Sequence, residues 1–264
     1  MPLFFIDIDG TLVGRGGSLF RDSTGQPTTA GISAYARLLE LPLQTILISS
    51  RPEAEMLTLS RLFSAAGYVA DFGAVIRFGE ERHLLGRADF RRQCEQDILP
   101  QLLREFDGYV EKHFPWYERL TFTVLLRGCR RLANRSYTAK ALARWLSRKQ
   151  LAISDNGATS RRDNLVCSDV RIFHLRPPEV SKAHAVAWLR QEKKLSQAFG
   201  IGDSPADLEF YPYCDVFFFA GSTAELAYAQ ELTGISARDN LIPLEVKGPA
   251  AFERAVEIVS SLLK

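Results

Sequence analysis

Short apolar runs alternate with amphipathic stretches near both ends of the chain. Residues 3–8 form an apolar run that stops at an Asp-Gly pair, which is typical of a buried strand ending in acidic residues. Residues 27–39 and 53–66 predict helices, while residues 44–48 and the stretch from residue 68 predict strands. The last part of the chain repeats this alternation, over residues 183–190, 197–201, 208–211, 216–220, 224–229 and 250–263. Because the strands are almost entirely apolar, we expect an α/β fold with a parallel sheet covered on both faces.

The middle of the chain has a different pattern. A hairpin is predicted around residues 79–80, and a long helix over 88–106 with a break near Pro100. Further elements of both kinds are predicted over residues 120–126, 138–149, 151–154, 164–167 and 171–175. We therefore expect residues 75–177 to form an α+β domain inserted into a core built from residues 1–74 and 178–264.

Composition narrows the classes of function. The 264 residues carry a net charge of +2, with 46% hydrophobic and 24% charged positions, which is ordinary for a globular protein and argues against a nucleic-acid partner. The first residues lack a signal-peptide pattern, and the most apolar later stretch is too short to cross a bilayer. Four widely separated cysteines show no metal-binding spacing, so we expect reduced thiols in a cytoplasmic protein without a membrane partner. Nothing in the sequence indicates the oligomeric state.

The first block that carries chemistry is the sequence DIDGTL at the end of the first predicted strand. Asp7 and Asp9 alternate along this strand, so their side chains share one face at its C-terminal end. Two close carboxylates repel each other unless a cation or a proton intervenes, and Mg²⁺ prefers such oxygen ligands. The alternative is a strand that ends in an Asp-Gly turn with solvated acids.

Two further blocks point to an anion. In LISSRP, Ser49 follows a strand and precedes a helix, where its hydroxyl and nearby N–H groups are able to hold phosphate oxygens. The alternative is simple capping of that helix by Ser49 or Ser50. Lys182 begins another predicted helix, an unfavourable place for a cation unless an anion lies nearby; otherwise it is a surface lysine.

The fourth block, GDSPAD, again places an acid at a strand end. Asp203 follows the predicted strand directly, and Asp207 comes four residues later. The pair is suited to bind or orient a divalent cation, and the alternative is an Asp-Ser-Pro turn without a ligand.

The four blocks, in this order and spacing, resemble the four motifs of the haloacid dehalogenase superfamily. The pattern is similar to the branch with a type-two cap between the second and third motifs, which includes Cof-like, sucrose-phosphate, mannosyl-phosphoglycerate and trehalose-phosphate phosphatases. The core resemblance covers residues 1–73 and 178–264, and the insert matches only in length and α+β character. Two positions depart from the family pattern, since Ala206 and Phe72 stand where the family usually has asparagine.

The resemblance implies a Rossmann-like core, an Mg²⁺ cofactor and a phosphatase that acts on a small phosphate ester, such as a sugar phosphate. It implies that Asp7 is the nucleophile of an aspartyl-phosphate mechanism and that Asp9 is the general acid and base. The remaining implied roles are phosphoryl binding by Ser49 and Lys182, substrate binding by Gly10, Ser50 and Arg51, and metal binding by Asp7, Asp9, Asp203 and Asp207.

Two alternatives remain open from the sequence. A phosphomutase would use the same residues but return the phosphoryl group to a sugar. A non-catalytic protein that binds a phosphorylated metabolite would keep the fold without turnover. The insert is expected to choose the substrate, which the sequence does not identify. Its arginines, including Arg127, Arg130 and Arg135, are compatible with an anionic sugar acid or with an ordinary surface.

Overall fold

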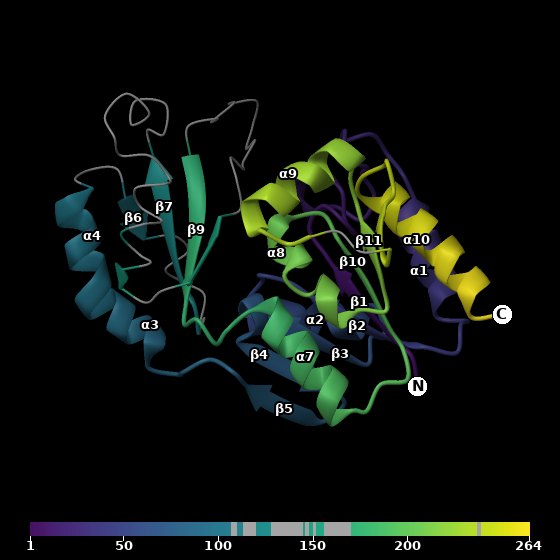
Figure 1. The fold of residues 1–264 in the computed structure, drawn as a ribbon, viewed down its shortest axis with the longest axis horizontal. Coiled ribbons are helices and arrows are strands. Elements are labelled where there is room, and N and C mark those ends of the chain that lie inside the picture. The colour runs from purple at the N-terminus through teal and green to yellow at the C-terminus, as the bar shows by residue number, and fades with distance from the viewer. Residues whose placement is uncertain are drawn as a thin grey trace. The chain divides into compact units, whose positions relative to one another are not determined.

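The computed structural model describes residues 1–106, 110–112, 120–127, 145, 148–149, 152–155, 170–236 and 239–264. The chain divides into two compact units (Figure 1). The first combines the two ends of the chain, Met1–His83 and Ser181–Lys264, and the second is Leu84–Val180. No helix in the described part of the chain is both long and apolar enough to span a membrane.

An eight-stranded sheet organises the first unit, in the order β12-β11-β10-β1-β2-β3-β4-β5. Its strands are β1 (Leu3–Asp7), β2 (Gln44–Ile48), β3 (Gly67–Ala70), β4 (Val75–Phe78), β5 (Glu81–Leu84), β10 (Ala198–Gly202), β11 (Val216–Phe219) and β12 (Leu241–Pro243). The pairs from β12 through β3 are parallel, whereas β4 runs antiparallel to β3. The expected α/β fold with a mostly parallel sheet is confirmed.

Helices of the first unit follow the strands in sequence. They are α1 (Ala30–Leu38), α2 (Glu53–Leu62), α7 (Lys182–Glu192), α8 (Pro205–Leu208), α9 (Thr223–Thr233) and α10 (Pro249–Leu262), with 3-10 turns at Arg15–Gly17, Asp71–Gly73 and Tyr211–Tyr213. In Figure 1, α1 and α10 lie side by side. Phe252 of α10 stacks on Phe4 of β1, and Phe4 also meets the edges of Phe199 and Phe218 from the neighbouring strands. Burial of these aromatic rings fixes the central strands, whose C-terminal ends carry the polar residues.

The predicted hairpin belongs to this sheet rather than to the insert. The sequence pattern assigned residues from 75 onward to the inserted domain, but β4 pairs with β3 along its whole length. A side chain at Gly67 would collide with the carbonyl oxygen of Arg77, so the glycine permits this close strand approach. The second unit consequently begins at Leu84 and ends at Val180.

The second unit contains helix and antiparallel sheet. A continuous helical segment is formed by α3 (Phe90–Gln93), a π-helical turn (Cys94–Ile98) and α4 (Leu99–Glu105). The expected break near Pro100 takes the form of this wider turn, because proline lacks an N–H and crowds the preceding turn. The sheet order is β6-β7-β9-β8, from β6 (Val110–Lys112), β7 (Phe122–Arg127), β8 (Ala152–Asp155) and β9 (Val170–Arg176). The strand predicted over 164–167, most of the helix predicted over 138–149, and Arg130 and Arg135 lie outside the described residues.

Candidate active site

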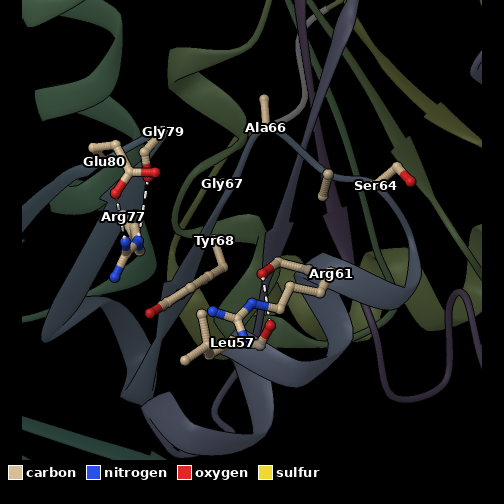
Figure 2. Close-up of a pocket in the computed structure, with 11 residues that line it drawn as sticks. Leu57, Arg61, Ser64, Ala66, Gly67, Tyr68, Arg77, Gly79 and Glu80 are labelled. Carbon is tan, nitrogen blue, oxygen red and sulfur yellow. Dashed lines mark hydrogen bonds and ion pairs between the residues drawn. The ribbon is translucent and has the colours of Figure 1, made fainter.

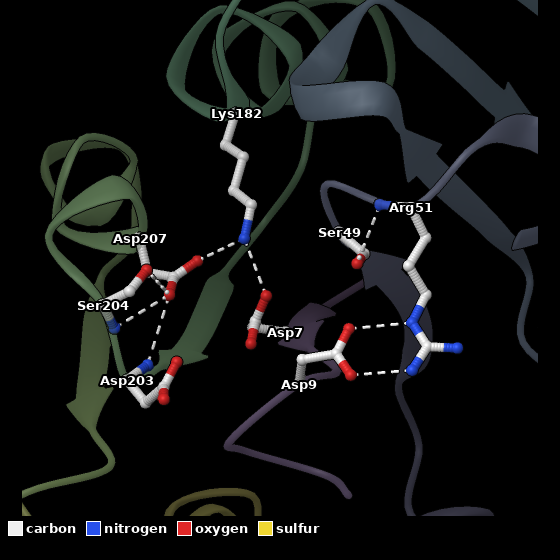
Figure 3. Close-up of polar contacts among 8 residues, drawn as sticks. All are labelled: Asp7, Asp9, Ser49, Arg51, Lys182, Asp203, Ser204 and Asp207. Carbon is white, nitrogen blue, oxygen red and sulfur yellow. Dashed lines mark hydrogen bonds and ion pairs between the residues drawn. The ribbon is translucent and has the colours of Figure 1, made fainter. Parts of the chain in front are cut away.

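Parallel strands bring the predicted site residues to one edge of the sheet. Asp7 is the last residue of β1, Ser49 directly follows β2, and Asp203 directly follows β10. Because β1 lies between β2 and β10, their C-terminal ends place these residues side by side. Figure 3 shows Asp7 at the centre of this group, with Asp203 on one side and Asp9 on the other.

A buried lysine joins two of the acids. Lys182 Nζ donates to Asp7 Oδ1 over 2.7 Å and to Asp207 Oδ1 over 2.5 Å. All three side chains are at most 6% exposed. Lys182 is therefore not a surface lysine: the two carboxylates offset its unfavourable position at a helix N-terminus. Burial opposes the charge of Lys182, but Asp207 and Asp7 outweigh that effect and raise its pKa.

The backbone around Lys182 is closely packed. Ser181 caps α7 by accepting a hydrogen bond from the N–H of His184, over 3.0 Å. A side chain at Gly73 would collide with the Ser181 carbonyl oxygen, and Gly73 has a φ of +104°. Phe72, where related sequences usually have asparagine, also lies in the left-handed region, with a φ of 60°. This strained loop fixes the start of α7 and so the position of the lysine.

Asp207 is fully engaged by its surroundings. Its Oδ1 accepts from Lys182, while its Oδ2 accepts from the N–H groups of Asp203 and Ser204 and from the Ser204 hydroxyl, over 3.2, 3.0 and 2.6 Å. These contacts form the capping box of α8. Asp207 thus orients both the lysine and the loop that carries Asp203.

Asp203 completes a group of three acids. Carboxylate oxygens of Asp7, Asp203 and Asp207 lie within 4.8 Å of one another. Among the described residues, the carboxylate of Asp203 has no hydrogen-bond donor of its own. A Cβ on Gly10 would collide with this carboxylate, so the glycine, with a φ of +86°, leaves room for it.

The electrostatics of this group favour a cation. Burial, and then the charge of Asp207, raise the pKa of Asp7 to about 7, although Lys182 opposes the shift. Burial and the charges of Asp7 and Asp207 also raise the pKa of Asp203 well above its usual range. Three acids are thus balanced by one lysine, and hard oxygen donors at this spacing fit Mg²⁺.

Asp9 lies outside the buried group and forms an ion pair. Its carboxylate accepts from Nε and Nη2 of Arg51 over 2.8 and 2.7 Å, a bidentate geometry (Figure 3). The Asp9 side chain is 50% exposed and that of Arg51 is 25% exposed. The hydrogen bond from Arg51 to Asp9 is the main reason why the pKa of Arg51 is raised. Arg51, expected to bind substrate, is here the partner of Asp9.

The Ser49 loop is buried and close to this pair. Ser49 is 1% exposed, and its hydroxyl accepts from the N–H of Arg51 over 3.2 Å. The loop is tied to β3, because the N–H of Ser49 donates to Val69 and the N–H of Asp71 donates to the Arg51 carbonyl. Ser49 does not cap α2, whose N-cap is Pro52 without a side-chain hydrogen bond, so its hydroxyl instead holds the turn before the helix. Figure 3 shows Ser49 and Arg51 on the side of Asp7 away from Asp203.

Comparisons with known proteins bear on the fold. No family model matches the chain, and no curated protein sequence matches it. Solved structures match this chain along nearly its whole length.

A protein of Thermoplasma acidophilum superposes with a TM-score of 0.67 at 13% identity, over 98% of both chains. A sucrose-phosphatase of Synechocystis, solved with sucrose and phosphate, superposes with a TM-score of 0.66 at 15% identity, also over 98% of both chains. The C-terminal domain of a trehalose-6-phosphate phosphatase of C. albicans gives 0.61 at 14%, over 98% of this chain and 92% of that one. The chain therefore has the fold of these structures, two of which are described as phosphatases.

The resemblance recognised from four sequence blocks is confirmed at the level of the fold. All of the predicted site residues lie at the C-terminal edge of its sheet. The sequence reasoning missed two participants, Ser204 and Glu55. Ser204 is readable as a cap, since a serine three residues before an acid is the capping-box signature. Glu55, which lies 3.4 Å from Arg51, gives no comparable signal because its spacing is that of an ordinary helix pair.

Proposed function

We propose that this protein is an Mg²⁺-dependent phosphatase that hydrolyses a small phosphate monoester, in particular a sugar phosphate, through an aspartyl-phosphate intermediate on Asp7. The observation that carries the proposal is the buried Asp7 carboxylate, in contact with Lys182 and within a group of acids suited to a divalent cation. A nucleophilic carboxylate beside cationic groups is what attack on a dianionic phosphoryl group requires, because the cations offset the repulsion between anions.

The metal would be held by the carboxylates of Asp7 and Asp203 and by the backbone carbonyl of Asp9. Asp207 supports this site indirectly, because its oxygens already bind Lys182 and the N–H groups before α8. When bound, the metal would neutralise charge on the acids and on the phosphoryl oxygens. Lys182 would neutralise a further phosphoryl oxygen.

The chemistry of the chain's own residues follows from their placement. Asp7 attacks phosphorus, the bond to the ester oxygen breaks, and Asp9 gives that oxygen a proton. A water then attacks the phosphoryl-enzyme, Asp9 takes the proton of the water, and the bond between Asp7 and phosphorus breaks to release phosphate. The half-exposed position of Asp9 suits this role, because it has access to both the leaving group and solvent.

Arg51 holds Asp9 in place. Its bidentate contact orients the Asp9 carboxylate. The contact with Glu55 holds the guanidinium from its other side. Asp9 must leave this pair, at least in part, to act as an acid, and Gly17 of the loop after β1 lies against the same guanidinium. Movement of that loop is therefore connected to the acid step.

Substrate choice is assigned to the second unit. The four motif blocks lie in the first unit, so the phosphoryl group can be handled by it alone. The segment Leu84–Val180 enters the chain between the second and third blocks and is free to vary the surface that meets the leaving group. Two of the similar structures are described as acting on sucrose phosphate and trehalose 6-phosphate, which supports a sugar phosphate as the substrate class.

The test is release of inorganic phosphate from a panel of esters with Mg²⁺ present. The panel contains p-nitrophenyl phosphate, hexose phosphates, sucrose 6-phosphate and trehalose 6-phosphate. Asp7→Asn should abolish release, whereas Asp239→Asn, at an exposed acid without a partner in the described structure, should leave it unchanged. Absence of release from every ester, or normal turnover by a folded Asp7→Asn protein, would contradict the proposal. Chromatography of the products distinguishes hydrolysis from transfer of the phosphoryl group to another position of the sugar.

A further inference from the structure

A second site lies in the first unit at the end of α2 and the beginning of β3. It is an open pocket of about 310 Å³ between the last turn of α2 and the β3–β4 pair (Figure 2). Its lining includes Leu57, Arg61, Ser64, Tyr68 and Arg77. None of its lining residues belongs to the candidate active site, because β3 begins at this pocket and ends at the catalytic edge of the sheet.

The pocket carries an excess of positive charge. Within the part of the chain that the structure describes, the guanidinium of Arg61 has no hydrogen-bond or ion-pair partner. Arg77 donates to the carbonyl of Gly79 over 3.2 Å and to Glu80 over 3.3 Å, but the Glu80 side chain is fully exposed. A fully exposed carboxylate neutralises an arginine weakly, because water screens the pair.

The end of α2 does not need Arg61 for its own stability. The carbonyl groups of Leu59, Ser60 and Arg61 accept hydrogen bonds from the N–H groups that follow the helix. The guanidinium is thus available to an incoming group. Figure 2 shows the guanidinium groups of Arg61 and Arg77 on either side of the Tyr68 side chain, whose ring is almost completely buried.

The lining of the pocket is mixed. Leu57 and the almost completely buried Tyr68 line it together with the two arginines and the exposed Ser64. The volume is at the lower end of the range for small-molecule sites. Arginine guanidinium groups are matched to phosphate and carboxylate in charge and in bidentate geometry. A small anion can therefore place its charged group against the arginines.

We propose that this pocket is a regulatory anion site that takes inorganic phosphate or the phosphate group of a small metabolite. Binding needs two positive groups, a pocket of suitable size and no competing buried acid, and the described lining provides all three.

Two elements connect the pocket to the catalytic loop. Helix α2 runs from the loop of Ser49 and Arg51 to the pocket, and β3 runs from the pocket back to that loop. The N–H groups of Asp71 and Phe72, directly after β3, donate to the carbonyls of Arg51 and Ser49. An anion that draws Arg61 and Arg77 together would shift the end of α2 and the beginning of β3. Its effect on turnover rests on the proposed function.

Ser64 offers a matched pair of variants for the binding test. Its φ of 52° is left-handed, a conformation that asparagine and aspartate both tolerate, and its side chain is exposed. Ser64→Asp adds a negative charge to the lining, whereas Ser64→Asn has the same shape without the charge. Equilibrium dialysis with labelled inorganic phosphate and Mg²⁺ should show two sites in the wild type and in Ser64→Asn. In Ser64→Asp, affinity at one site should fall by about tenfold or more.

A second pair tests the arginines directly. Arg61→Gln with Arg77→Gln should remove the second phosphate, while the charge-matched Arg254→Gln with Lys264→Gln, at exposed residues of the C-terminal helix and tail, should keep it. An equal number of phosphate sites in the wild type and in the double variant Arg61→Gln with Arg77→Gln, or equal affinities in Ser64→Asp and Ser64→Asn, would overturn the assignment of this pocket.

Kinetics test the connection to the active site. Inhibition by phosphate should be of mixed type in Ser64→Asn and purely competitive in Ser64→Asp, because only the active site then binds the product. Identical inhibition patterns in the two variants would overturn regulation through this pocket. Failure of the proposed function is distinguishable, since it appears as absence of phosphate release from every ester while the phosphate site that depends on Arg61 and Arg77 is still found by dialysis.

Discussion

Replacement of the nucleophile should stabilise the metal-free protein. The pKa of Asp7 is raised from 3.8 to about 7 by burial and by the neighbouring acids. The folded protein therefore holds this proton more tightly than the unfolded chain does, and stability contributed by the group is lost as pH rises from about 4 to about 7. An asparagine at this position keeps the oxygen that accepts from Lys182 but carries no charge.

The size of the effect follows from the shift. One pKa unit corresponds to about 1.4 kcal/mol, so ionised Asp7 destabilises the folded metal-free protein by about 4 kcal/mol at pH 8. At pH 5 the folded protein has Asp7 protonated, and the corresponding difference is about 2 kcal/mol. Asp7→Asn should therefore raise the free energy of unfolding in EDTA at both pH values, and by about 2 kcal/mol more at pH 8.

Urea unfolding followed by circular dichroism measures this difference. The control is Asp239→Asn, which removes an exposed acid and should change stability by less than about 0.5 kcal/mol. Saturating Mg²⁺ should stabilise the wild type, by about 2.7 kcal/mol at a hundredfold excess over Kd, and should stabilise Asp7→Asn less. The reasoning is refuted if Asp7→Asn is less stable than the wild type at pH 8 in EDTA, or if its effect does not depend on pH.

Three further outcomes are expected. EDTA should abolish activity, Mg²⁺ should restore it and Ca²⁺ should not. Asp203→Asn should raise the Mg²⁺ concentration needed for half-maximal rate by about tenfold or more. An unchanged Mg²⁺ requirement would remove Asp203 from the metal site. Asp9→Asn should lower kcat by about 10²- to 10⁴-fold while the melting temperature stays within a few degrees, because its ion pair with Arg51 is half exposed; a normal kcat would exclude it as the acid. Lys194→Gly should raise the free energy of unfolding by about 1 kcal/mol, because Lys194 follows α7 with a φ of 46°, whereas Lys194→Ala keeps the strained backbone and should give no such gain.

The strands whose C-terminal ends form the site could be predicted from the sequence. An apolar run followed by acids predicts both a buried strand and its polar end, because burial and exposure alternate locally along the chain. The positions of Asp7, Ser49 and Asp203 at one edge then follow from the geometry of a parallel sheet. These inferences needed only neighbours in sequence and the general rule for α/β connections.

Other features depended on partners far away in the chain. The hairpin that begins at Val75 has the pattern of any hairpin, and only its pairing with β3 shows that it extends the large sheet. The capping-box spacing of Asp207 was visible, but its contact with Lys182 was not.

The sequence by itself determined which segments are buried strands and which acids stand at their ends, since both depend on the local order of apolar and polar residues. The tertiary structure decided the partners of those acids. Asp9 meets Arg51, from the next strand's loop, and Asp7 meets Lys182 from the other end of the chain. It also decided that residues of the last turn of α2 and of the β3–β4 pair line a common pocket that includes two arginines. Contacts of this kind depend on how the helices and strands pack against one another. The periodicity of apolar residues along the chain predicts only whether a residue is buried, not which residue it contacts.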